Sequence, residues 1–117
     1  MTNVAELAEL LAEAQRSATS VVDPTRYAAL DLPTAVAVQT AVTTALNASV
    51  GMIKTAIRPD GAGVAAPIYS SRIGRDAGFE LQATTVIGLE VEVGMVLARD
   101  VRSSADIPDA IDHFFLA

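Results

Sequence analysis

The amino-acid sequence contains no cysteine and no tryptophan, and its only histidine is His113. A chain without cysteine forms no disulfide bond, which fits the reducing cytoplasm, and it offers no thiol for catalysis. Zinc centres draw mainly on cysteine and histidine, so a thiolate or histidine-rich metal site is excluded within this chain. We therefore expect a cytoplasmic protein.

Basic residues are also scarce. Eight Lys and Arg residues oppose fourteen Asp and Glu residues, and the formal net charge is −6. Nucleic acids and anionic membranes are bound through Lys and Arg, so we expect neither kind of partner. The N-terminus carries glutamates in place of the basic start of a signal peptide. No apolar run reaches the ~20 residues that span a bilayer.

Large apolar side chains are rare as well. Hydrophobic residues make up 51% of the chain but aromatic residues only 4%, and Ala and Val dominate. Side chains this small fill a core only where backbones approach closely. Part of the apolar surface should therefore pack against other chain segments or subunits, which predicts a homo-oligomer. The length of 117 residues corresponds to a single domain or to the N-terminal part of one.

Apolar residues at helical spacing predict helices at both ends of the chain. The first covers residues 3–16 with Asn3 as its N-cap, and the second covers residues 32–48. A final helix is expected in "ADIPDAIDHFFL" (105–116), whose early proline fits a first helical turn. That helix would carry His113.

Strands are expected between these helices. "GMIKTAI" (51–57) is short, apolar and bounded by turn residues, and residues 84–98 show the strongest alternation. Residues 58–78 are rich in glycine and proline and predict an irregular connection. Helices first and strands afterwards indicate an α+β fold, with a helical segment over 1–50 and strands plus the final helix over 51–117.

Two short patterns resemble catalytic signatures but lack their context. "GAGVAA" (61–66) has the spacing of a dinucleotide-binding turn, which needs a strand before it and a helix after it. Pro67 falls where the helix should develop, so we interpret the segment as a loop. His113 is interpreted as a surface histidine, and no pattern supports a triad with the serines at positions 70, 71, 103 and 104.

Lys54 lies inside the strand expected over 51–57. In one interpretation its aliphatic stem covers apolar surface while the amine reaches water. In the other, the amine lies near carboxylates or an anionic substrate and transfers protons. The local sequence favours the first interpretation and leaves the second open.

Glu90 and Glu92 interrupt the apolar run "GLEVEVGMVL" (88–97). Side chains at i and i+2 of a strand point to the same face, about 7 Å apart. A solvated edge strand is the ordinary explanation, yet beyond Glu92 this face continues with glycine, valine and alanine. Two like charges at the start of an apolar face need a counter-charge or a proton, and Mg²⁺ with oxygen ligands would supply the former. Composition and periodicity leave a wet acidic face and a cation site equally open.

The segment "LEVEVGMVLARDV" (89–101) resembles the E-x-E strand of the fumarylacetoacetate hydrolase superfamily, in particular its branch of 2-keto-4-pentenoate hydratases and 4-oxalocrotonate decarboxylases. Other similar features follow the family's order. They are a helix like "ELAELLAEAQ", Tyr27, the glutamine of "VAVQTAV", the glycine and lysine of "GMIK", the loop "GVAAPIYS" and the segment "ADIPDAIDHFF". The resemblance covers nearly the whole chain and implies N-terminal helices followed by the first strands of a mixed β-roll.

That resemblance also implies a site and a reaction. Glu90 and Glu92 match the first two ligands of Mg²⁺ or Mn²⁺, and Lys54 matches the lysine that assists proton transfer. Tyr69 and Ser70 are assigned to substrate binding. The implied enzyme is a hydro-lyase acting on 2-hydroxy-2,4-dienoates or 2-oxo acids through a metal-stabilised enolate. A 2-oxo acid decarboxylase and an acylpyruvate hydrolase of the same superfamily share these ligands and stay open as alternatives.

The chain departs from the family pattern at three points, one of which is that Ile53 stands where an aromatic residue often precedes the lysine. Lys54 stands three residues after Gly51 where the family usually has two, so either the match is shifted or the strand is bulged. The sequence also stops at Ala117, just before the strand that carries the third carboxylate ligand in the family. We therefore expect a truncated β-roll that alone binds metal weakly and is inactive. The rival from another class is a non-catalytic remnant or oligomerisation module, in which the glutamates form only an acidic strand face.

Overall fold

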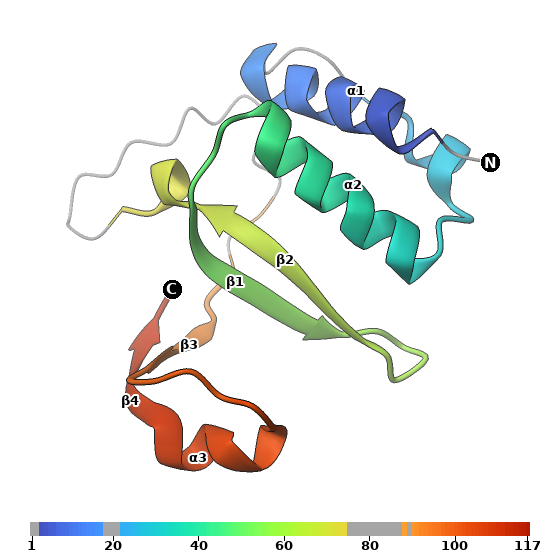
Figure 1. The fold of residues 1–117 in the computed structure, drawn as a ribbon. Coiled ribbons are helices and arrows are strands. Elements are labelled where there is room, and N and C mark those ends of the chain that lie inside the picture. The colour runs from blue at the N-terminus through green and yellow to red at the C-terminus, as the bar shows by residue number, and fades with distance from the viewer. Residues whose placement is uncertain (1–2, 18–21, 75–87, 89) are drawn as a thin grey trace. The chain divides into compact units, whose positions relative to one another are not determined.

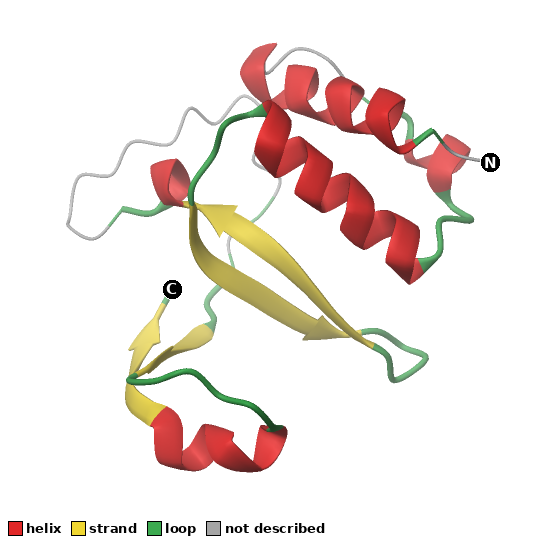
Figure 2. Ribbon diagram, viewed as in Figure 1, coloured by secondary structure: helices red, strands yellow, loops and turns green. Residues whose placement is uncertain are grey.

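The computed structural model describes residues 3–17, 22–74, 88 and 90–117, and the chain divides into two compact units, Met1–Thr84 and Thr85–Ala117. Figure 1 labels the helices and strands, and Figure 2 separates them by colour. The first unit holds a pair of helices and a β-hairpin. The second holds a β-hairpin whose strands are joined through a short helix. The expected α+β class is confirmed at this level.

Helices α1 (Val4–Ser17) and α2 (Leu32–Ala45) pack side by side in the first unit (Figure 1). Their contact forms a small core, because the residues spaced along one face of each helix meet there. The buried members are Leu7, Ala8, Val38 and Val42, with Val4, Leu11, Val22, Tyr27, Leu30, Ala41 and Leu46 half-buried around them. Both helices confirm the periodicity, although α2 ends three residues before the expected position 48.

Side-chain caps fix where these two helices begin. The Asn3 Oδ1 accepts hydrogen bonds from the backbone N–H of Ala5 (3.1 Å) and Glu6 (3.3 Å), which confirms the expected cap of α1. The Asp31 Oδ1 accepts from the Thr34 N–H at 2.8 Å and caps α2 in the same way. Each cap satisfies donors that have no partner within the helix.

Strands β1 (Val50–Ile57) and β2 (Gly63–Tyr69) form an antiparallel hairpin. Over the first step, β1 advances by two residues while β2 advances by one, so Gly51 is the extra residue of a β-bulge. A Cβ atom at Gly51 would collide with the end of the Ile73 side chain, so a larger residue here requires that side chain to move. The structure thus contains a bulge three residues before Lys54.

Strand β2 corrects the expectation of an irregular connection over residues 58–78. Glycine and proline mark it as a loop, but both strands of a two-stranded hairpin are edge strands, where proline is tolerated. The turn before β2 contains Gly61 at φ +82°, a left-handed conformation suited to glycine. The segment "GAGVAA" therefore runs from a turn into a strand, and no helix follows it as a dinucleotide-binding turn would require.

In the second unit, β3 (Val93–Leu97) pairs antiparallel with β4 (Ile111–Leu116). The connection contains the single turn η3 (Ser104–Asp106) and the short helix α3 (Ile107–Ala110). Strand β3 confirms residues 93–97 of the strand expected over 84–98, whereas residues 88, 90–92 and 98 lie outside it, so the strand begins only after Glu90 and Glu92. Residues 84–87 and 89 of that expectation lie outside the described residues.

The final helix expected over 105–116 is wrong beyond Ala110. Helix α3 spans only four residues, and the chain then turns into β4. The second half of the segment is rich in β-branched and aromatic side chains, which suit a pleated strand better than a helix. Pairing with β3 supplies backbone partners that a longer helix would have supplied internally. His113 therefore lies on a strand and not on a helix.

Candidate functional site

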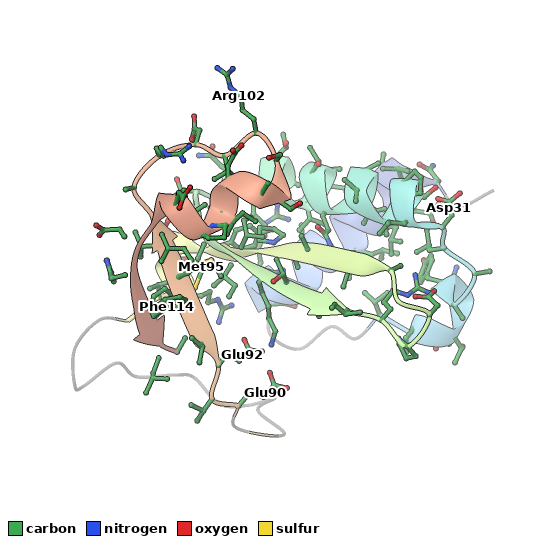
Figure 3. The ribbon with its side chains drawn as sticks, turned by 90° about the horizontal axis from the view of Figure 1, so that it is seen from below. Asp31, Glu90, Glu92, Met95, Arg102 and Phe114 are labelled. Atoms are coloured by element: carbon green, nitrogen blue, oxygen red, sulfur yellow. The ribbon has the colours of Figure 1, made fainter. Side chains whose placement is uncertain are left out.

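Glu90 and Glu92 lie immediately before β3 in the second unit. The backbone of Glu92 exchanges two hydrogen bonds with Ala117, from N to O at 2.8 Å and from O to N at 2.9 Å. This pair extends the β3–β4 ladder by one step and fixes the backbone that carries Glu92. Both glutamates are exposed, and Figure 3 shows their side chains on the same side of the chain.

The two carboxylates match the kind of donor that a hard divalent cation prefers. Mg²⁺ is commonly held by one or two carboxylates, with water and substrate oxygens completing its coordination. Within the described residues, no three His, Cys, Asp or Glu side chains gather into a metal-binding cluster. The two carboxylates are thus of the donor type that suits Mg²⁺ or Mn²⁺, and no third side chain of these types joins them in the described part of the chain.

Lys54 lies on β1, opposite Ala66 of β2. Lys54 is half-buried, and so is Met52 two residues before it. The neighbours of Lys54 in the sequence, Ile53 and Thr55, are exposed. Strand alternation therefore places the lysine on the more covered face of this hairpin. The structure brings Glu90 and Glu92 together in one unit, and Lys54 belongs to the other.

Tyr69 and Ser70 stand where β2 ends and the single turn η2 (Ser70–Arg72) begins. They line a hollow of about 380 Å³ in the first unit. The Tyr69 hydroxyl lies 3.2 Å from Thr43 Oγ1 on α2, which ties the end of the hairpin to the helix pair. The remaining lining residues are Gln15, Arg16, Leu46, Asn47, Ala48, Ser49, Ser71 and Arg72.

Sequence reasoning did not single out Arg16 or Arg72, although both line this hollow. Arg16 ends an amphipathic helix and Arg72 follows a pair of serines, and neither context is distinctive. Only the folding of the hairpin back toward the helix ends brings the two arginines to one place. No local sequence pattern could have identified them.

His113 lies on β4 opposite Val96, and its Nδ1 is 2.7 Å from Asp112 Oδ2. Both side chains are well exposed, at 58% each. Between Val96 and Leu97 the ladder is irregular, because β4 advances by two residues where β3 advances by one. This agrees with a surface histidine, placed on a strand.

None of the helices in the described part of the chain is long and apolar enough to cross a bilayer. A scan against models of protein families, a search of curated proteins and a search of solved structures each found no match to this chain.

Proposed function

We propose that this protein is a divalent-metal-dependent hydro-lyase that hydrates 2-hydroxy-2,4-dienoates. The observation that carries the proposal is the pair Glu90 and Glu92, which are exposed and lie on the same side of the chain where β3 begins. The resemblance of residues 89–101 to the E-x-E strand of hydratases supports the same assignment. We further propose that the enzyme is cytoplasmic and acts as a homo-oligomer.

Within this proposal, Glu90 and Glu92 hold Mg²⁺ or Mn²⁺. When bound, the cation supplies Lewis-acid stabilisation of negative charge on the oxygens of a 2-oxo acid. Lys54 moves protons between the substrate's hydroxyl oxygen and its carbon chain. Tyr69 and Ser70 orient the substrate through their hydroxyl groups, which reduces the entropy lost in reaching the reactive geometry.

The overall reaction balances as the addition of one water molecule. The proton of the 2-hydroxyl group leaves oxygen and carbon 5 gains a proton, which converts the dienol into a 2-oxo-3-alkenoate. Water then adds its hydroxyl group to carbon 4 and a hydrogen to carbon 3. The product is a 4-hydroxy-2-oxo acid, and Lys54 serves as donor and acceptor in these transfers.

Paramagnetic Mn²⁺ tests the metal site without requiring turnover. We expect substoichiometric Mn²⁺ to broaden the amide signals around Glu90 and Glu92 first. Changing the outer-shell partners of metal ligands costs about 10- to 100-fold in affinity, so loss of a ligand should cost at least about tenfold. Glu90→Gln with Glu92→Gln should therefore abolish the broadening, and the matched pair Glu6→Gln with Glu9→Gln on exposed α1 should not. Unchanged broadening in the first pair of substitutions would overturn the metal site.

A substrate screen separates the reactions that share this ligand pair. We expect loss of dienol absorbance with 2-hydroxypenta-2,4-dienoate, dependent on Mg²⁺ or Mn²⁺. Turnover of oxalocrotonate with release of carbon dioxide would identify a decarboxylase instead, and cleavage of acylpyruvates a hydrolase. Absence of both metal binding and turnover of any of these by the whole protein favours the non-catalytic module.

A further inference from the structure

We propose that the hollow beside Tyr69 binds a small oxyanion, carried as a carboxylate or a phosphate group. Its walls come from the C-terminal end of α1, the turn between α2 and β1, and η2. All of its lining residues belong to the first unit. The hollow shares Tyr69 and Ser70 with the proposed substrate site but includes neither Glu90 nor Glu92, so the inference does not rest on the proposed hydro-lyase activity.

The formal charges on the walls are both positive. Arg16 and Arg72 line the hollow, and none of the described carboxylate side chains does, although the protein as a whole carries a net charge of −6. Among the described residues, Arg72 makes no hydrogen bond or ion pair through its guanidinium group. A guanidinium presents several N–H donors in a planar fork, which suits the paired oxygens of carboxylate and phosphate.

Arg16 is held in place by the protein. Its Nη2 donates a 2.7 Å hydrogen bond to the Ala45 carbonyl oxygen at the end of α2. Its Nη1 lies 3.6 Å from Glu13 Oε2, and Glu13 does not line the hollow. These contacts leave further N–H donors of the guanidinium for a ligand and limit the conformational entropy that binding would cost.

Neutral donors surround the two arginines. The side chains of Asn47, Ser49, Ser70 and Ser71 add an amide and three hydroxyl groups to the walls. Two of these walls are fastened together, since the Ser70 N–H donates to the Ser49 carbonyl oxygen at 2.8 Å. Charged and neutral hydrogen-bond donors on backbone segments that are bonded to each other suit an anion, because its oxygens accept several hydrogen bonds at once.

The size of the hollow limits the ligand. Its volume of about 380 Å³ lies at the small end of the range of about 300–1,000 Å³ for small-molecule sites. Leu46 and Ala48 contribute an apolar part of the wall next to the polar groups. These features favour a small organic acid or phosphate ester over a macromolecular partner.

The test is a titration of the full 117-residue chain with inorganic phosphate and, separately, with succinate, at constant ionic strength, followed by amide NMR. We expect saturable shifts at Asn47–Ser49 and Ser70–Ile73 with at least one of the two probes. Arg72→Gln should weaken the binding at least fivefold. The control Arg58→Gln removes a guanidinium that pairs with Asp60 at 3.0 Å in the β1–β2 turn, and it should leave binding unchanged.

The two probes distinguish the sources of the oxyanion. Saturation by phosphate alone indicates a phosphate ester, and saturation by succinate alone or by both indicates a carboxylic acid. Absence of saturable shifts with either probe would overturn the proposal. Equal shifts at the exposed Arg99 and Arg102, or unchanged affinity in Arg72→Gln, would do the same, because either result means that the anion contacts arginines in general.

Discussion

The aromatic ring of Phe115 on β4 lies directly over Gly94 on β3. The two residues face each other across the ladder, and a Cβ atom added to Gly94 would collide with the ring. Gly94 lies on the strand face that begins with Glu92, because the two positions are two residues apart. The glycine that follows Glu92 on this face is thus covered by an aromatic ring of the opposite strand.

Gly94→Ala should destabilise the second unit, because the ring has to move to admit the new methyl group. Insertions of this kind into packed sites typically cost about 1–3 kcal/mol. Loss of the Phe115 ring-current shifts and faster amide exchange in β3 would report the change. Gly63→Ala on β2 is the matched control, since nothing lies within 4 Å of its added Cβ. Combining Gly94→Ala with Phe115→Leu should restore part of the protection, and absence of any restoration would contradict this packing.

Acid should weaken the first unit through Asp31. Hydrogen bonds from Thr34, first through its hydroxyl and second through its backbone N–H, lower the pKa of Asp31 below its ordinary value of 3.8. A carboxyl whose pKa is lowered on folding stabilises the fold above its ordinary pKa, and that contribution is lost as the pH falls through the lowered pKa. We therefore expect the melting temperature to fall as the pH drops below 3.8.

Substitutions at Asp31 separate the charge from the cap. Asp31→Ala should lower the melting temperature at neutral pH, because the Thr34 N–H loses its acceptor. Asp31→Asn keeps a good N-cap without a titrating group, so it should retain most of the neutral stability and show a flatter acid limb. Identical acid limbs for the original protein and Asp31→Asn would contradict the assignment.

Lys54→Gln should reduce turnover by about 100- to 10,000-fold, the usual range for a group that transfers protons. Manganese binding should be unaffected, since the lysine supplies no ligand. Lys54 is the only lysine of the chain, so selective lysine labelling gives a single side-chain signal that follows its protonation directly. Equal turnover by the original protein and Lys54→Gln, measured in the whole protein, would contradict the proposed proton transfer and leave Lys54 with only the packing role of its stem.

The β3–β4 hairpin carries an apolar face that should promote association with a second copy of the chain. Met95 and Phe114 form one cross-strand pair and Val93 and Leu116 the next, with exposed fractions of 48%, 61%, 70% and 76% in that order. Figure 3 labels the first of these pairs. The four positions carry no charge, so the face can pair with itself about a two-fold axis without repulsion.

Phe114→Asp should therefore shift the protein toward monomer in sedimentation velocity measurements. It places like charges opposite each other in a two-fold contact. Thr55→Asp, on an exposed position of β1, adds the same charge outside this face and should leave the sedimentation coefficient unchanged. A monomeric original protein at high concentration would contradict the expected homo-oligomer.

Local sequence patterns predicted the elements whose stability is local. Leu7 and Val38 recur within helical periods that bury one face, and the Asn3 cap is a contact between near neighbours. Strands β2 and β4 were missed because their formation depends on a partner strand elsewhere in the chain. Taken without its partner strand, Pro67 indicates a loop, but it lies in β2, which pairs with β1. Ile111 continues the helical pattern of the sequence, but in the structure it lies in β4, which pairs with β3.

The same division applies to the sites. Glu90 and Glu92 stand two residues apart, so a local pattern was enough to predict them as a pair, although both lie just before β3 and not within it. Arg16 and Arg72 could not be predicted as a pair, since one ends a helix and the other follows a distant hairpin, and only the tertiary fold brings them to one hollow. The fold class could be predicted from the order of helices and strands in the sequence. The division into two units could not, because the amino-acid composition does not change at the boundary.

The bulge at Gly51 has a consequence for how this strand should be compared with others. The face to which a side chain points is set by the number of ladder steps along the strand. At Gly51, two residues of β1 occupy one such step. Lys54 consequently has the facing that it would have two residues after a glycine in a regular strand. A sequence pattern that fixes the number of residues between the glycine and the lysine does not match a bulged strand. A pattern that counts ladder steps matches both the bulged and the regular strand. Deleting Gly51 should therefore preserve the pairing of Lys54 with Ala66 and with it the facing of the lysine side chain.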